Sequence, residues 1–200
     1  MKYDELTAGQ IEAIVNKLGG MEGVQRLLSG ELIVSEPTRV WKTWRTLKLG
    51  TGLKTADDFR SALKEADGNI GDCGNDILGK LAFAVSPEEK EVGLIVVSVA
   101  EIGFEGGATR VDIYRRAQEL GLDLCPNEVG PQLRLQYKDQ PKGELLLIAM
   151  EPIADSRGDL YVFNVERYGG GGQRLDGSSG FLSTFWNADD RLVFLRRRLS

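Results

Sequence analysis

A nearly uninterrupted apolar run covers residues 92–100, with the sequence Val-Gly-Leu-Ile-Val-Val-Ser-Val-Ala. Residues branched at the β-carbon dominate this run, and they favour strands because their side chains pack well on a pleated surface. A strand with apolar residues at successive positions is covered on both of its faces. We therefore expect a sheet centred on residues 92–100, with other elements packed on each side.

Helix start and stop signals recur along the rest of the chain. Thr7 and Gln10 have the spacing of a capping box, and Gly19 and Gly20 end the apolar stripe that follows them. A second short helix comes directly after, so residues 1–30 are predicted to form a helical hairpin. The expected helices cover residues 7–18, 21–29, 55–66, 75–78, 109–120 and 127–135.

From residue 144 onward the pattern changes to short strand-like runs separated by turn residues. We expect an antiparallel β-meander over residues 144–198, with the glycines of 169–172 at a hairpin tip. The predicted strands cover residues 31–35, the end of 41–49, 145–150, 160–165 and 192–195. Because 42% of the 200 residues are hydrophobic, the chain can bury a real core, and we predict a single α+β domain over residues 1–200.

The sequence contains no histidine. Ser-His-Asp triads, Cys-His dyads and zinc sites built on imidazole are therefore excluded. Cys73 and Cys125 lack CxxC spacing and are expected to be reduced, and Cys73 would be a nucleophile only if a helix N-terminus lowered its pKa. Residues 67–76 gather oxygen ligands in a glycine-rich loop but lack the EF-hand spacing. We predict no metal and no cofactor.

Paired carboxylates are the general acid–base device that remains without histidine. The acids near apolar segments are Glu128, Glu144, Glu151 and Glu166. An enzyme of this kind needs two such acids in one pocket, one of them with a raised pKa. Because nothing in the sequence indicates that any two converge, the sequence leaves catalysis open and favours a protein that is not an enzyme.

Two short segments are basic in a chain whose formal net charge is -5. Residues 39–54 hold five basic residues and no acid, and residues 191–198 hold four arginines and no acid. Tryptophans that stack on bases beside cations that bind phosphates are typical of proteins that bind single-stranded nucleic acid. The alternative is that the tryptophans belong to the core and the cations to a solvated surface. The candidate nucleic-acid or anion-binding residues are Trp41, Trp44, Arg45, Lys48, Arg196, Arg197 and Arg198.

Residues 46–59 and 124–153 resemble segments of a group of bacterial hypothetical proteins whose function is uncharacterised. The resemblance implies a bacterial cytosol and carries no catalytic residue. The sequence is consistent with that location, because no apolar run approaches the roughly 20 residues that span a bilayer and the N-terminus lacks a secretory pattern. We therefore expect a cytoplasmic protein with no membrane partner.

Three functions remain. The leading hypothesis is a non-catalytic, cytosolic protein-interaction module with an unknown protein partner, because it needs no chemistry that the sequence fails to show. The alternatives are a nucleic-acid-associated protein that uses the basic patches at 39–54 and 191–198, and an enzyme that uses paired carboxylates. Without imidazole, any pH response between about 6 and 8 must come from a perturbed carboxylate, a cysteine or the terminal amine.

Overall fold

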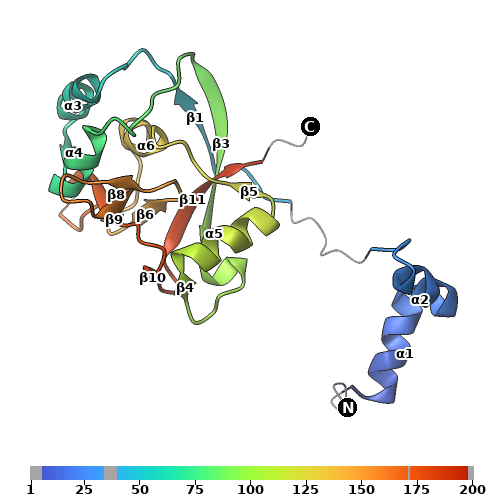
Figure 1. Ribbon diagram of the computed structural model, residues 1–200. Coiled ribbons are helices and arrows are strands. Elements are labelled where there is room, and N and C mark those ends of the chain that lie inside the picture. The colour runs from blue at the N-terminus through green and yellow to red at the C-terminus, as the bar shows by residue number, and fades with distance from the viewer. Residues whose placement is uncertain (1–5, 34–39, 171, 198–200) are drawn as a thin grey trace. The chain divides into compact units, whose positions relative to one another are not determined.

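The computed structural model describes residues 6–33, 40–170 and 172–197. The chain divides into two compact units, residues 1–38 and 39–200, which we call the N-terminal hairpin and the body (Figure 1). The body combines helices with a mixed sheet, which confirms the α+β fold class. The single domain predicted for residues 1–200 stays a prediction.

The N-terminal hairpin consists of α1 (Ala8–Lys17) and α2 (Gly20–Leu28), as the sequence predicts. Thr7 and Gln10 form the expected capping box, in which the Thr7 hydroxyl accepts from the Gln10 amide and the Gln10 side chain accepts from the Thr7 amide. Gly19 has φ 90°, a left-handed conformation that favours glycine, and it turns the chain between the two helices. The strand predicted over residues 31–35 is absent from 31–33, and its last two residues lie outside the described part.

One sheet dominates the body, with the strand order β1-β3-β11-β6-β8-β9-β2. Two short strands lie off this path, where β5 pairs with β11 and β7 pairs with β8. The strands are β1 (Arg45–Leu49), β2 (Gly68–Ile70), β3 (Lys90–Ser98), β5 (Leu122–Asp123), β6 (Leu145–Ile148), β7 (Ile153–Ala154), β8 (Leu160–Arg167), β9 (Gln173–Ser179) and β11 (Arg191–Arg196). The run at residues 92–100 forms the interior strand β3, which has antiparallel neighbours β1 and β11 on its two sides.

The C-terminal strands begin as the predicted antiparallel meander, since β6 pairs with β8 and β8 with β9. The hairpin tip at 169–172 is closed by a hydrogen bond from the Tyr168 amide to the Gly172 carbonyl. The last strand, β11, instead returns to the middle of the sheet, antiparallel to β3 and parallel to β6. Leu192, Val193 and Phe194 of β11 are fully buried, so this strand needs neighbours on both edges and cover on both faces.

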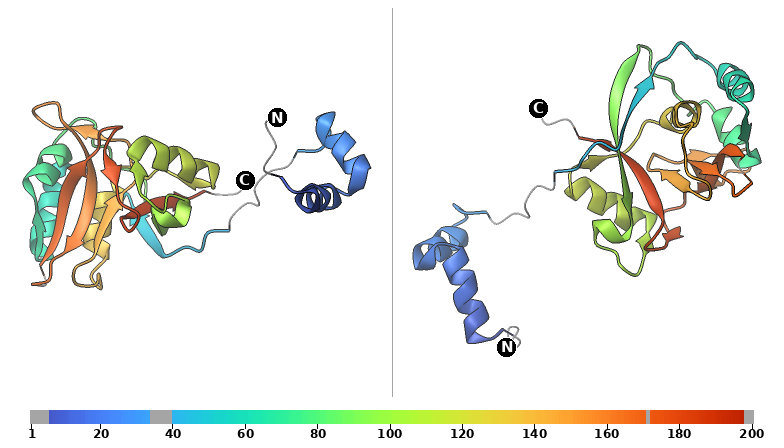
Figure 2. Two further views of the ribbon diagram at one scale, coloured as in Figure 1. Left: turned by 90° about the horizontal axis from the view of Figure 1, so that it is seen from below. Right: turned by 180° about the vertical axis from the view of Figure 1, so that it is seen from behind.

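The helices of the body lie against this curled sheet. They are α3 (Ala56–Glu65), α4 (Asp72–Leu78), α5 (Arg110–Glu119) and α6 (Val129–Gln136), with the 3-10 turn η1 (Ala100–Ile102). Figures 1 and 2 show α6 between β1 and the hairpin of β8 and β9, and α6 contacts both. A separate two-stranded sheet pairs β4 (Ala108–Thr109) with β10 (Phe185–Trp186). None of the described helices is long and apolar enough to span a membrane.

The core of the body joins the sheet to its helices. Phe83 lies edge-on to both Phe59 of α3 and Phe163 of β8, so one aromatic group links the outer helix to the sheet. Tyr114 of α5 packs against Phe194 of β11 in the same way. Cys125 is buried, Cys73 is half-buried, and both thiols are free.

Candidate functional site

The tryptophans of the first basic segment are half-buried and packed against the core. The Trp41 indole nitrogen donates to the carbonyl oxygen of Leu120 at 2.8 Å, and the Trp44 ring stands edge-on to Tyr137 with 5.0 Å between centroids. Base stacking needs an accessible ring face. This packing favours the alternative in which the two tryptophans belong to the core.

The cations next to these rings are also engaged within the body. The Arg45 guanidinium lies 4.5 Å from the Tyr137 ring centroid and forms an ion pair with Asp139 at 2.8 Å. Lys48 forms an exposed ion pair with Glu89 at 3.2 Å. Arg198 lies outside the described residues. A groove in the body is lined by Arg196 and Arg197. Its lining does not include any of the four candidates in the first basic segment, which are Trp41, Trp44, Arg45 and Lys48.

Arg196 and Arg197 line a groove of about 860 Å³, which we call the basic groove. Its lining also includes Lys90, Thr43 and Thr46. The two basic segments meet here, because Arg196 Nη1 donates to Thr43 Oγ1 at 3.4 Å. The structure thus unites the C-terminal arginines with the threonines of residues 39–54, and not with the tryptophans.

The strand register explains how the basic groove forms. Thr46 of β1 lies opposite Gly93 of β3, and Arg196 continues the neighbouring strand β11. A β-carbon on Gly93 would lie 3.2 Å from Thr43 Oγ1 and 3.6 Å from Arg196 Cβ, so glycine leaves this part of the groove open. Lys90 has no sequence signal of its own, because it stands among acids and only the pairing of β1 with β3 brings it to the groove.

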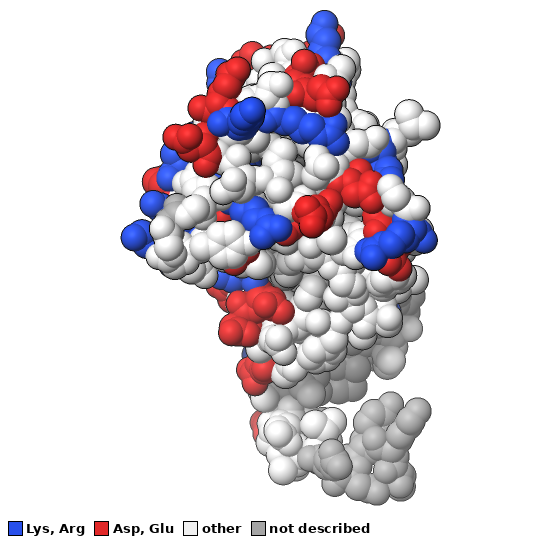
Figure 3. Space-filling view, turned by 90° about the vertical axis from the view of Figure 1, so that its left-hand side faces the viewer, with Lys and Arg blue, Asp and Glu red and all other residues white. Residues whose placement is uncertain are grey.

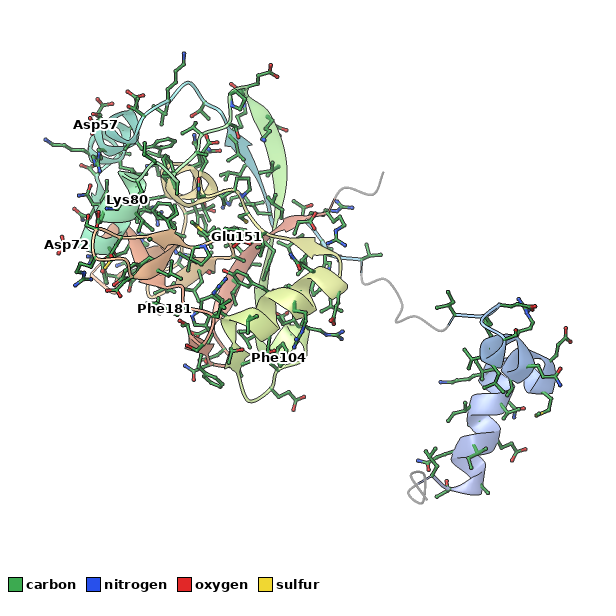
Figure 4. All side chains as sticks on the ribbon, in the orientation of Figure 1. Asp57, Asp72, Lys80, Phe104, Glu151 and Phe181 are labelled. Carbon is green, nitrogen blue, oxygen red and sulfur yellow. The ribbon has the colours of Figure 1, made fainter. Side chains whose placement is uncertain are left out.

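Exposed apolar side chains gather at another part of the body. Val111, Phe181, Leu182 and Phe185, which we call the apolar patch, have exposed fractions of 42%, 42%, 59% and 56%. They are neighbours because the Val111 amide donates to the Leu182 carbonyl and Phe185 pairs with Thr109. Figure 4 shows Phe181 and Phe104 at the end of the body where β4 and β10 lie. No sequence signal marked this patch, since its residues come from two segments about 70 positions apart.

The face of the body that carries α3 and α4 has a different character (Figure 3). Lysine and arginine side chains alternate there with aspartate and glutamate, and a broad area below them carries none of these four residue types. Asp57 pairs with Arg60 at 2.8 Å and Lys80 pairs with Asp76 at 2.8 Å. Mixed signs at close spacing give a solvated surface without a strong local field.

Two of the four candidate carboxylates, Glu128 and Glu144, serve separate hydrogen-bond networks. Glu128 is fully buried, and its two oxygens accept from the backbone amides of Gly50 and Ser86, each at 2.8 Å. Glu144 instead accepts from the Tyr137 hydroxyl at 2.8 Å and pairs with Arg191 at 2.6 Å. Glu151 is exposed and Glu166 is half-buried. The described residues that line the basic groove include one acid, Asp123, so this groove lacks the carboxylate pair that the enzyme hypothesis requires.

In the loop at 67–76, the side-chain oxygens of Asn75 and Asp76 accept hydrogen bonds from Arg60 and from the Ser156 amide. Residues 68–70 form β2, which pairs in parallel with β9, and α4 begins at Asp72. The carboxylate of Asp176 accepts from the Gly74 amide at 3.1 Å and so caps the start of α4. Among the described residues, no three side chains of the metal-binding types cluster.

Arg134 is a buried cation that no sequence signal marks. Its guanidinium donates to the side-chain oxygen of Gln140 and to the carbonyl oxygens of Tyr137 and Glu166. Burial lowers the pKa of Arg134 to about 10. Because these acceptors lie at the C-terminal end of α6 and on β8, Arg134 is a structural connection between the helix and the sheet.

The fold predicts a flat pH profile of stability between pH 6 and 8. The fold lowers the pKa of three described carboxyl groups, those of Asp58, Asp76 and Asp155. Hydrogen bonds from Lys80 and Ser156 hold the pKa of Asp76 at about 2. Burial raises the pKa of the Cys125 thiol, and burial and Glu144 raise the pKa of Tyr137 to about 12.

A group whose pKa is higher in the folded state than in the unfolded state contributes its full stabilisation at pH values below its unfolded-state pKa. That pKa is about 8.5 for cysteine and about 10 for tyrosine, and the contribution is lost as the pH rises above it. We therefore expect the free energy of unfolding to stay constant from pH 6 to 8 and to fall progressively above about pH 8.5. Urea unfolding at half-unit pH steps measures this profile. A sizeable stability transition between pH 6 and 8 would contradict it.

Comparison with known proteins finds no matching family model, no matching curated protein and no matching solved structure.

Proposed function

We propose that the protein is a non-catalytic protein-interaction module and that the apolar patch is its binding surface. The observation that carries the proposal is the exposure of four large apolar side chains side by side, at Val111, Phe181, Leu182 and Phe185. Single exposed apolar residues are ordinary, whereas a contiguous group of them marks an interaction surface. Aromatic side chains, phenylalanine included, are also enriched at protein–protein interfaces.

The patch is supported by well-ordered elements. The Arg110 guanidinium is buried, lies 4.9 Å from the Tyr114 ring centroid and donates to the Phe181 carbonyl at 3.3 Å. The Arg110 amide donates to the Thr184 carbonyl at 2.8 Å, which ties the loop to the start of α5. A surface that is already in its binding conformation loses little conformational entropy when a partner binds. The partner we propose is another protein with a complementary apolar surface.

The other functions have less support from the described residues. Trp41 and Trp44 are half-buried and packed against the core, which gives less support to stacking on nucleic-acid bases. No observation favours catalysis by paired carboxylates. A cytoplasmic location remains part of the proposal, and the two free cysteines support it because disulfides are rare in the cytosol.

A partner captured from the native cell and then purified tests the proposal. We expect Leu182→Asp to weaken its binding at least 30-fold in calorimetry, because it places a charge in the centre of the patch. Phe181→Ala should weaken binding by a smaller factor.

The matched control is Leu81→Asp, which changes a fully exposed leucine outside the patch and should leave binding unchanged. Thermal unfolding of each variant verifies that it is folded. If folded Leu182→Asp binds the purified partner as tightly as the unchanged protein does, the patch is not the binding surface.

A further inference from the structure

Positive charge collects in the basic groove of a chain whose net charge is -5. Lys90, Arg196 and Arg197 line it, and Asp123 is the only acid among the described residues of its wall. We propose that the basic groove binds a phosphate-bearing ligand through Lys90, Arg196 and the hydroxyl groups of Thr43 and Thr46. This site is separate from the apolar patch and does not depend on the function proposed for that surface.

The donors of the groove suit a phosphate group. A guanidinium presents parallel N–H groups that match two phosphate oxygens, and a lysine ammonium adds a mobile point charge. One Arg196 nitrogen is held by Thr43 at 3.4 Å, which orients the guanidinium. Thr46 lines the groove from β1, opposite the small residue Gly93 of β3.

Asp123 limits the positive charge of the groove. It binds Arg197 at 2.8 Å through Nε and at 2.7 Å through a terminal nitrogen. This pair holds Arg197 at the wall and neutralises its charge in part. An anionic ligand would therefore be attracted by Lys90 and Arg196, repelled by Asp123, and bound more tightly if the carboxylate were removed.

The groove has room for a ligand larger than one phosphate ion. Its volume is about 860 Å³, and the apolar side chains of Val92 and Leu195 contribute to its wall. Apolar wall atoms can contact a sugar or a base while the cations contact phosphate oxygens. Two sources share this chemistry, a small phosphorylated molecule and the phosphodiester backbone of a single strand.

The full chain tests the proposal with two probes at about 50 mM salt, inorganic pyrophosphate followed by calorimetry and fluorescent single-stranded dT12 followed by anisotropy. We expect at least one probe to bind. Lys90→Gln together with Arg196→Gln should lower its affinity about tenfold or more. For dT12, removing two cations should also reduce the dependence of log affinity on log salt by about 1 to 2.

Asp123→Asn should change affinity in the opposite direction and strengthen binding several-fold. Lys64→Gln with Lys142→Gln is the matched control, because it removes two exposed cations outside the groove and should have little effect. Circular dichroism and thermal unfolding verify that every variant is folded.

The two probes distinguish the sources of the phosphate. Binding of dT12 alone supports a single strand as the ligand, whereas binding of pyrophosphate supports a small phosphorylated molecule. The proposal is overturned if neither probe binds the unchanged protein at low salt, or if the folded Lys90→Gln, Arg196→Gln variant binds as tightly as the unchanged protein. Weaker binding by Asp123→Asn would also overturn it.

Discussion

Replacement of Glu128 by leucine is expected to lower the free energy of unfolding by about 3–5 kcal/mol, because it leaves several buried hydrogen-bond donors without an acceptor. The Glu128 carboxylate is fully buried at the start of α6. It accepts from the backbone amides of Gly50 and Ser86 and from the Gln132 side chain at 3.1 Å. Each backbone amide left without a partner costs about 1–3 kcal/mol.

The position of these amides makes the effect large. Gly50 directly follows β1, and Ser86 lies in the loop before β3, so one side chain connects both segments to α6. The same face of α6 continues to Gln136, whose side-chain amide accepts from the Lys48 amide and donates to the Lys48 carbonyl on the edge strand β1. Loss of Glu128 should therefore loosen the contact between α6 and the edge of the sheet.

Urea unfolding measures this change. Glu128→Gln should destabilise by a smaller amount than Glu128→Leu, because the amide keeps one acceptor oxygen but places an NH2 group against a backbone N–H. Glu65→Gln and Glu65→Leu, on the exposed side of α3, are matched controls and should each change stability by at most about 0.5 kcal/mol. A loss below about 1 kcal/mol for Glu128→Leu would show that the buried network does not hold the segments together.

Replacement of Gly130 by alanine is expected to lower the free energy of unfolding by about 1–3 kcal/mol, although alanine favours helices over glycine by about 1 kcal/mol. A β-carbon on Gly130 would lie 2.6–2.8 Å from Cβ, Cγ and Cδ2 of Phe163. Phe163 is fully buried on β8 and packs against Phe83, so it has little room to move. The methyl group must therefore push α6 away from the sheet.

Gly106→Ala is the matched control in the body. Gly106 has no heavy atom within 4 Å of the added carbon and does not have a positive φ, so alanine there should be neutral or slightly stabilising. Gly130→Val should be worse than Gly130→Ala, because it adds two more carbons at the same contact. A Gly130→Ala protein that is as stable as the unchanged protein would mean that Phe163 adapts without cost.

The local elements of this fold are predictable because their signals are local. Thr55 and Asp58 form the capping box of α3, and Thr109 caps α5 through the Asp112 amide, as their spacing predicts. The density of branched residues in β3 indicates its burial in the same way. These signals depend on neighbours three or four positions away, so they can be recognised without knowledge of the tertiary contacts.

The strands β2 and β9 are not predictable from local sequence signals. The sequence of β9, Gln-Arg-Leu-Asp-Gly-Ser-Ser, has one fully buried residue, Leu175, and no apolar alternation. It forms a strand because β8 pairs with it along seven residues and β2 covers its other edge. Pairing with neighbouring strands thus stabilises β9 as a strand, although its sequence lacks the apolar alternation from which a strand is predicted.

By itself, the sequence determined the capped helices, the interior strand β3, the α+β class and, through its lack of histidine, the absence of imidazole chemistry. Only the tertiary structure decided which side chains meet. The register of β1, β3 and β11 brings Lys90 and Arg196 into the lining of one groove, and packing turns Trp44 towards Tyr137. The physical reason is that capping and strand propensity act within a few residues, whereas charge clusters and exposed patches form between segments that only folding brings together.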